Sequence, residues 1–507
     1  MRSHSAPRLA TPLLGALITV SATPSAFSAP AHGLMPGDQT RAQAEARLRE
    51  QLAEILRAPE LSSADVGVHV RSLSDGHTVF ERNASKLFNP ASNVKLVTTA
   101  AALWFLGPSY RFKTVAYRDR VLNGGVLQGN LYIRGFGDPT LTDEKVFGFV
   151  NEIALHGIDE VRGDLVIDDS FFDQVFEGPG WEQEWGDKSY APSMGALAVN
   201  FGNFSIRVLP GDSVGSGARV RIWPEIPTID VVNSAVTRGD GSRSRIWIGT
   251  SKADKEKIEV TVRGSISVGD TAGEVDYRRV YQPTIYAGEH LKRMLELRGV
   301  KVKGRVRVGP LNRSGVPVAA HFSSPLAEVI STLNKFSNNF MAEQILKTLG
   351  AEIRGEPGSW DKGCSVLADF LHEIGVPPGS FVIGNGSGLN DINRFTPEQI
   401  TRILQAMQGR FELASEFVGS LAVAGTSGTI TSRFANSPAA SRLRAKTGSL
   451  FGVSALSGYV VTKDNQVLAF SVMMNGYTGR AREMWTVQDR IGNTLAEFQG
   501  GEVIARP

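Results

Sequence analysis

A long β-rich block separates two stretches with helical periodicity, and this order is the strongest constraint on the fold. Between about residues 113 and 315, short alternating runs are separated by Gly, Asp and Asn, as in 129–134 and 163–168. Apolar residues recur at helical spacing before this block and again from Leu326 onward. A chain of 507 residues is also too long for one ordinary core. We therefore expect a domain built from both ends of the chain and interrupted by an insertion.

The expected architecture is α/β, with helices packed on an antiparallel sheet and a nested insertion. The main domain combines residues 33–112 and 316–507, and the inserted β-rich domain combines 113–194 and 270–315. Residues 195–269 have their own rhythm of strands and turns, which predicts a nested inserted domain.

Local patterns agree with a mixed main domain. Alternating residues around a Ser-Asp-Gly turn predict a hairpin over 66–82, and an almost entirely apolar run predicts a buried helix over 90–106. The chain is expected to close with strands at 455–462 and 467–475 and a helix from about 480 to 498.

The N-terminus has the order of a secretory signal peptide, which we place at residues 1–30. Arg2 and Arg8 precede an apolar stretch at 13–20 and a small-residue segment at 25–31. The apolar stretch is much shorter than the roughly 20 residues that span a bilayer. We expect an exported, periplasmic protein without a transmembrane helix in the mature chain, and loose membrane association stays open.

Several function classes find no support. The net charge of +3 is mild and no Lys/Arg run tracks a phosphate backbone, so we expect no nucleic acid partner. The histidines lack metal-ligand spacing, and there is no phosphate-binding loop, so we expect neither metal nor cofactor. Cys364 is the only cysteine and cannot form an internal disulfide; its context favours a buried small residue over a nucleophile.

Three short motifs point to a chemistry. They are Ser-Asn-Val-Lys at 92–95, Ser-Asn-Asn at 337–339 and Lys-Thr-Gly at 446–448. Each alone is better explained as an ordinary helix, turn or strand end. Together they occur in a meaningful order, at a helix start, a turn between helices and a strand, and this favours a catalytic site.

Ser92 and Lys95 form the expected nucleophile and base. Residues at i and i+3 of a helix share one face, so the amine can lie beside the hydroxyl that it activates. Desolvation and a second nearby cation both disfavour a charged lysine. We expect Lys446 to be that cation, so that neutral Lys95 accepts the proton from Ser92.

The other motif residues are expected to hold substrate. Ser337 can relay a proton to the leaving amine, and the Asn339 amide can orient Lys95 and hold a substrate carbonyl. The strand edge at 446–449 can bind an extended peptide by β-augmentation, and Gly448 leaves room for the substrate backbone. Lys446, with the hydroxyls of Thr447 and Ser449, suits a terminal carboxylate. Backbone N–H groups of Ser92 and Ser449 can form an oxyanion hole.

The three motifs resemble the signature of penicillin-recognising serine enzymes, S-x-x-K with S-D-N and K-T-G. Here Asn338 replaces the aspartate, and this difference argues against a class A β-lactamase. The first two motifs lie 245 residues apart and the last two 109. A long β-rich insertion at the first interval is similar to the low-molecular-mass class C penicillin-binding proteins, the D-alanyl-D-alanine carboxypeptidase/endopeptidase family (peptidase family S13). Gly-rich motifs at 135–141 and 385–389 agree.

This resemblance implies a β-lactamase/transpeptidase-like main domain and a serine D-Ala-D-Ala carboxypeptidase that also acts as an endopeptidase. Peptidoglycan stem peptides are the implied substrates and β-lactam antibiotics the implied covalent inhibitors, and a homodimer stays open. In this family an acidic residue of the insertion lies near the catalytic lysines. The segment Trp185-Gly186-Asp187-Lys188 resembles that loop, which makes Asp187 the candidate.

Two other functions stay open. A β-lactamase would use the same motifs but admit water faster to the acyl-enzyme, so rapid turnover of penicillin would reveal it. A sensor module would keep the penicillin-recognising pocket without turnover. The intact set of Ser92, Lys95, Ser337, Asn339 and Lys446 argues against the sensor.

Overall fold

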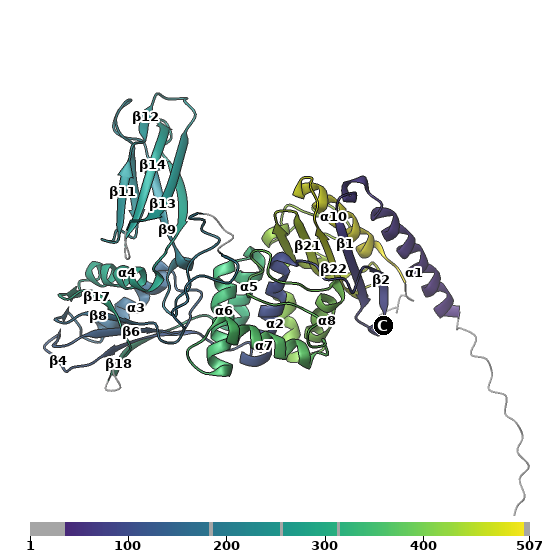
Figure 1. Ribbon diagram of the computed structural model, residues 1–507, viewed down its shortest axis with the longest axis horizontal. Coiled ribbons are helices and arrows are strands. Elements are labelled where there is room, and N and C mark those ends of the chain that lie inside the picture. Colours follow the sequence, from purple (N-terminus) through teal and green to yellow (C-terminus); the bar gives the residue numbers. More distant parts are fainter. Residues whose placement is uncertain (1–35, 182–185, 254–256, 312–314, 501–507) are drawn as a thin grey trace, which may run out of the picture.

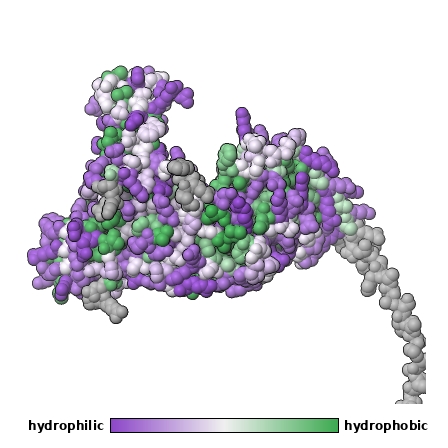
Figure 2. All heavy atoms as spheres, viewed as in Figure 1, coloured by the Kyte–Doolittle hydropathy of each residue, from purple (hydrophilic) through white to green (hydrophobic). Residues whose placement is uncertain are grey.

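The computed structural model describes residues 36–181, 186–253, 257–311 and 315–500. It has a main domain, which holds both ends of the described chain, and an insertion that lies beside it (Figure 1). One sheet of the insertion stands upright above the rest. The surface is hollowed between this upright sheet and the main domain (Figure 2). The expected signal peptide, residues 1–30, lies outside the described residues.

A six-stranded antiparallel sheet forms the centre of the main domain, in the order β19-β20-β21-β22-β1-β2. The early strand β1 pairs along its whole length with β22, near the end of the chain. Residues on both sides of the insertion therefore share one sheet. The strands are β1 (Asp65–Ser72), β2 (Thr78–Arg82), β19 (Ala422–Val423), β20 (Leu443–Leu450), β21 (Val453–Val461) and β22 (Val467–Asn475).

Helices cover both faces of this sheet. In β21, Ala455 and Tyr459 pack in one core while Leu456 and Val460 pack in the other, as the alternation of a strand requires. The helices of the first core are α2 (Val94–Leu106), α5 (Leu326–Phe336), α6 (Asn339–Arg354), α7 (Trp360–Glu373), α8 (Pro397–Gln408) and α9 (Phe411–Ser420). Those of the second core are α1 (Pro36–Ile55) and α10 (Ala481–Glu497).

The insertion has its own core beneath two sheets and two helices. A five-stranded sheet has the order β17-β8-β6-β3-β18, and a four-stranded sheet the order β16-β7-β5-β4. The elements are β3 (Lys113–Arg118), β4 (Leu122–Asn123), β5 (Val126–Leu127), β6 (Leu131–Gly135), α3 (Asp143–Leu155), β7 (Glu160–Val161), β8 (Leu165–Asp168), α4 (Pro283–Leu297), β16 (Lys301–Val302), β17 (Val306–Val308) and β18 (Val316–Phe322).

The upright part is a nested unit whose base is the three-stranded sheet β10-β9-β15. A four-stranded sheet, in which β14 pairs with β11, β12 and β13, forms the rest. The strands are β9 (Asn203–Leu209), β10 (Arg219–Trp223), β11 (Ile229–Asn233), β12 (Val236–Arg238), β13 (Arg245–Lys252), β14 (Ile258–Ser267) and β15 (Glu274–Arg279).

The observed boundaries differ from the expected ones by several residues. β18 pairs with β3, so residues 316–322 complete the insertion's sheet and the main domain resumes at α5. β15 pairs with β9, so the nested unit extends to residue 279 rather than 269. In both cases the closing strand belongs with its antiparallel partner, which the local sequence pattern does not reveal.

The helix expected over 90–106 begins later than its apolar pattern suggests. Residues Ala91–Asn93 form a 3₁₀ turn, and α2 starts at Val94. Across the residues that the structure describes, no helix is both long and apolar enough to cross a bilayer.

Close packing of β20 on β21 predicts a sensitive position. A Cβ on Gly458 of β21 would lie 2.0 Å from the carbonyl oxygen of Arg444 in β20. This oxygen belongs to the backbone, so it cannot move aside as the end of a flexible side chain can. We expect Gly458→Ala to lower the free energy of unfolding by about 1–3 kcal/mol, measured by urea titration.

The matched control is Gly419→Ala, at an exposed position of α9 where a Cβ meets nothing. It should be neutral or stabilising, by up to about 1 kcal/mol, because alanine favours a helix. Equal midpoints for Gly458→Ala and the unchanged protein would contradict the packing argument.

Candidate active site

Ser92 lies in the 3₁₀ turn before α2, and several contacts fix this turn. The turn is anchored to β21 through Asn93, whose Nδ2 donates to Ser457 Oγ at 2.8 Å. On the other side, Gly388 has a φ of +77°, and a Cβ there would lie 1.9 Å from Ala91 O. The loop at 386–388 therefore packs directly against the backbone that carries Ser92.

Lys95 is fully buried and has three oxygen atoms within hydrogen-bond distance. Its Nζ donates to Asn339 Oδ1 at 2.7 Å and to Ser387 O at 2.6 Å. It also lies 2.9 Å from Ser92 Oγ. Carbonyl oxygens can only accept, so they take up the two hydrogens of a neutral amine. The lone pair then faces the Ser92 hydroxyl, which is the geometry of a general base.

Burial is the main cause of the lowered pKa of Lys95. It lowers the pKa of Lys95 to about 7, against the smaller opposing effect of the buried Glu343 carboxylate. The expected repulsion between the two lysines is present, but it lowers the pKa of Lys446 rather than that of Lys95. Burial first and then repulsion from Lys95 hold the pKa of Lys446 well below its usual value.

The second motif forms the corner between α5 and α6. Ser337 ends α5 in the left-handed conformation, with φ at +57°. Asn338 is the N-cap of α6, and its side chain accepts from Met341 N. Aspartate and asparagine cap helices about equally well, which explains why asparagine fits where the signature has aspartate. Asn339 then points from the first turn of α6 to Lys95.

Lys446 links the third motif to the second. It is fully buried in β20, and its Nζ donates to Ser337 Oγ at 2.8 Å and to Thr447 O at 2.9 Å. The structure thus brings together two serine–lysine pairs. Ser92, Ser337, Thr447 and Ser449 line one cleft of 330 Å³.

The edge of β20 is open where a substrate would bind. Its neighbour β19 pairs only with Arg444 and Ala445, so the edge from Lys446 to Leu450 has no strand partner among the described residues. The structure gives a reason for Gly448 besides the expected room for substrate. A Cβ there would lie 2.7 Å from Pro90 O, so the glycine makes room for the segment that carries Ser92.

Sequence reasoning missed Glu343, which is fully buried on α6. Its carboxylate accepts from Gly386 N at 3.0 Å and from Ser387 N at 2.8 Å. It also accepts from the indole of Trp360. Glu343 therefore holds the loop whose carbonyl contacts Lys95, and it is a positioning residue. A glutamate inside an apolar helical pattern, four residues after Asn339, was the available signal.

The far wall of the cleft was also missed. Thr429, Arg433 and Trp485 line it together with the motif residues. Thr447 Oγ1 donates to Thr429 Oγ1 at 2.8 Å. Arg433 donates to Asp489, so its charge is partly compensated. These residues come from a 3₁₀ turn (Gly428–Ile430), a loop and α10, and no short motif connects them to Ser92.

The structure does not place Asp187 among the partners of the catalytic lysines. Its Oδ2 accepts from Thr250 N at 2.7 Å and lies 2.9 Å from Arg278 Nε. An arginine and a backbone N–H already satisfy this carboxylate, so it joins the loop to the nested unit. Trp185, in the same expected loop, lies outside the described residues.

A serine hydroxyl beside a buried lysine amine, facing a second serine–lysine pair across a cleft, defines a serine hydrolase that works by acyl transfer. The chain belongs to the D-Ala-D-Ala carboxypeptidase 3 (S13) family, whose model matches residues 48–497. The resemblance seen in the three motifs, the α/β fold class and the enzyme class, a serine-type carboxypeptidase, are thereby confirmed.

Individual relatives agree with this assignment. The chain is 35% identical over 473 residues to the D-alanyl-D-alanine carboxypeptidase of Actinomadura sp. (strain R39), covering 89% of this chain and 85% of that protein. It is 25% identical to D-alanyl-D-alanine carboxypeptidase DacB of Haemophilus influenzae, covering 82% and 86%. The crystal structure of penicillin binding protein 4 (dacB) from Haemophilus influenzae shares the fold, with a TM-score of 0.77 and 23% identity. The match covers 88% of this chain and 99% of that chain.

The lowered pKa of Lys95 predicts how acylation depends on pH. Neutral Lys95 accepts the serine proton and predominates above about pH 7, so the rate constant for acylation by penicillin should rise with pH and level off above that midpoint. Stopped-flow measurements from about pH 5 to about pH 9 test this. Lys95→Arg should lose the rise together with most of the rate, because a guanidinium stays charged. A flat profile in the unchanged protein would contradict Lys95 as the base.

Glu343→Gln should shift that midpoint to lower pH. The Glu343 carboxylate favours the charged form of Lys95, so removing its charge lowers the pKa of Lys95 further. The plateau rate should also fall by about ten-fold, because an amide no longer accepts both N–H groups of the loop. Glu352→Gln, at an exposed position of the same helix, is the control and should change neither quantity. An unchanged midpoint in Glu343→Gln would rule out the electrostatic effect.

Proposed function

We propose that this chain removes the terminal D-alanine from peptidoglycan stem peptides through an acyl-enzyme on Ser92. The observation that supports this most is the environment of Lys95. Its two carbonyl partners take up the hydrogens of the neutral amine and leave the lone pair for Ser92. This arrangement supplies the base that a serine nucleophile needs, without a histidine or a metal ion.

In the first half-reaction, Lys95 takes the proton from Ser92 Oγ while Oγ attacks the carbonyl carbon between the two D-alanines. The carbonyl oxygen becomes an oxyanion, which the backbone N–H groups of Ser92 and Ser449 can stabilise. Collapse of this intermediate breaks the C–N bond. The leaving amine takes a proton through Ser337, which accepts a hydrogen bond from Lys446. Free D-alanine and an ester on Ser92 result.

The open edge of β20 supports the binding of an extended peptide end. Lys446 and the hydroxyls of Thr447 and Ser449 suit the terminal carboxylate of the substrate, and Arg433 adds positive potential to the same cleft. Asn339 can donate to a substrate carbonyl through its Nδ2, which now donates to Tyr190 O.

In the second half-reaction, water attacks the ester and releases the shortened peptide. We propose that β-lactams mimic the D-alanyl-D-alanine end and form a similar ester that water opens slowly. Cross-links joined through the same type of carbonyl need only a different leaving amine, so endopeptidase activity belongs to the same proposal. The N-terminal segment of residues 1–30 supports export to the periplasm, where these substrates lie.

Ser92→Ala tests the proposed nucleophile directly. The variant should lose covalent labelling by a fluorescent penicillin, and D-alanine release from a D-alanyl-D-alanine peptide should fall by at least about 1,000-fold. Ser62→Ala, at an exposed serine outside the three motifs and the cleft, should label like the unchanged protein. Labelling that persists without Ser92 would end this proposal. Rapid and repeated hydrolysis of penicillin would instead favour a β-lactamase.

A further inference from the structure

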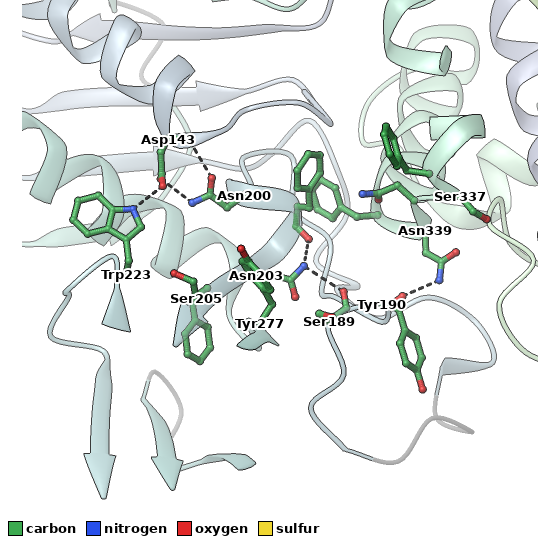
Figure 3. A pocket seen from close by; sticks show the side chains of 15 residues that line it. Asp143, Ser189, Tyr190, Asn200, Asn203, Ser205, Trp223, Tyr277, Ser337 and Asn339 are labelled. Atoms are coloured by element: carbon green, nitrogen blue, oxygen red, sulfur yellow. Dashed lines mark hydrogen bonds between the residues drawn. The ribbon is translucent and has the colours of Figure 1, made fainter. Parts of the chain in front are cut away.

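A second pocket continues from the catalytic residues into the insertion. It has a volume of 520 Å³, and Ser337 and Asn339 line one end of it (Figure 3). The other end is lined by Trp223 and Tyr277, at the base of the nested unit. The pocket therefore follows a path that leads away from the scissile bond, toward parts of a substrate beyond the stem-peptide end.

The two aromatic residues lie in one row across the base sheet. Trp223 of β10 and Tyr277 of β15 are each paired with Ser205 of the central strand β9. Paired residues share a face of the sheet, and the rings are 40% and 56% exposed. Neighbouring strands lie about 4.8 Å apart, so the backbone positions that carry the two rings lie about 10 Å apart, with a small serine between them. That separation is close to the length of one disaccharide.

The Trp223 ring is held in place although it is exposed. Its indole N–H donates to Asp143 Oδ2 at 2.6 Å (Figure 3). The other carboxylate oxygen, Oδ1, accepts from Asn200 Nδ2 at 2.7 Å and lies 2.9 Å from Nε2 of the fully buried His290. A solvent-facing indole that is oriented by a partly buried polar network is preorganised for a flat ligand.

The charge of the pocket favours an uncharged ligand. Among the described residues that line it, Asp143 is the one with an ionised side chain. Burial raises the pKa of Asp143, but hydrogen bonds, led by the one with His290, lower it more, so the group is an anion. An anion without a lining cation disfavours the acidic stem peptide. The next row of the same face carries Arg207 and Arg221, outside the pocket, where acidic peptide branches could meet them.

We propose that the row Trp223–Ser205–Tyr277 is a binding platform for the glycan strand of peptidoglycan, a polymer of N-acetylated amino sugars. The apolar faces of alternate sugars stack on the two rings, and the acetamido and hydroxyl groups meet the polar side chains between them. The platform holds polymeric substrate while its stem peptide reaches Ser92. This inference rests on the proposed function, because it names the polymer to which that substrate is attached.

The test measures binding without turnover, by calorimetric titration of the full chain with soluble oligomers of N-acetylglucosamine. Trp223→Ala and Tyr277→Ala should each weaken binding by about ten-fold, because each variant removes one of the two stacking faces. Trp223→Phe keeps a ring but loses the N–H that contacts Asp143, so an intermediate loss is expected. Trp247→Ala is the matched control. This tryptophan is 56% exposed on β13 of the nested unit, and it does not line the pocket.

Three results would overturn the platform. They are no binding of the oligomers by the unchanged protein, equal weakening by Trp247→Ala and Trp223→Ala, or competition by acidic stem peptides alone. Unfolding midpoints of the variants equal to that of the unchanged protein show that any loss is local. Penicillin labelling of Ser92 reports separately on the proposed function, because it requires the cleft and not the platform. Loss of oligomer binding with intact labelling therefore counts against the platform only.

Discussion

The site depends on one buried amine. Lys95 Nζ joins three segments that are far apart in sequence, namely the turn of Ser92, the first turn of α6 at Asn339 and the loop carbonyl of Ser387. A fully buried amine is costly unless each of its hydrogens finds an acceptor. Satisfying Lys95 therefore requires all three segments to be in place at once. The same contacts that bury the amine also orient it toward the serine.

Helix α6 connects the surroundings of Lys95 to the insertion through hydrogen bonds and an ion pair. Asn339 Nδ2 donates to Tyr190 O. Further along the helix, Gln344 Nε2 donates to Gly195 O. The buried Lys347 pairs with Asp173 at 2.6 Å. One helix thus positions the partner of Lys95 and holds the insertion along its length. A displacement of the insertion would therefore also displace the contacts around Ser92. This is a physical reason for the main domain and the insertion to form one structure.

Local patterns in the sequence predicted what depends on local structure. The two lysine motifs follow from spacing on a helix or a strand, and the hairpin over β1 and β2 follows from alternation around a turn. The contacts of Glu343 could not be predicted, because its partners are backbone N–H groups of a loop more than forty residues away. For Asp187 the sequence suggested a role that the structure does not support. The loop and its carboxylate could be recognised, but its pairing with Arg278, which is distant in sequence, could not.

The two buried lysines explain how one site can both accept and donate a proton. Two charged amines in one buried cluster repel each other, and the effect falls on Lys446, whose pKa is lowered by burial and by Lys95. In the proposed mechanism, Lys95 becomes charged when it accepts the Ser92 proton, and Lys446 is then more readily deprotonated. The hydrogen bond from Lys446 to Ser337 would lead that proton toward the leaving amine. Protonation of the base on one side of the cleft would thereby promote proton donation on the other.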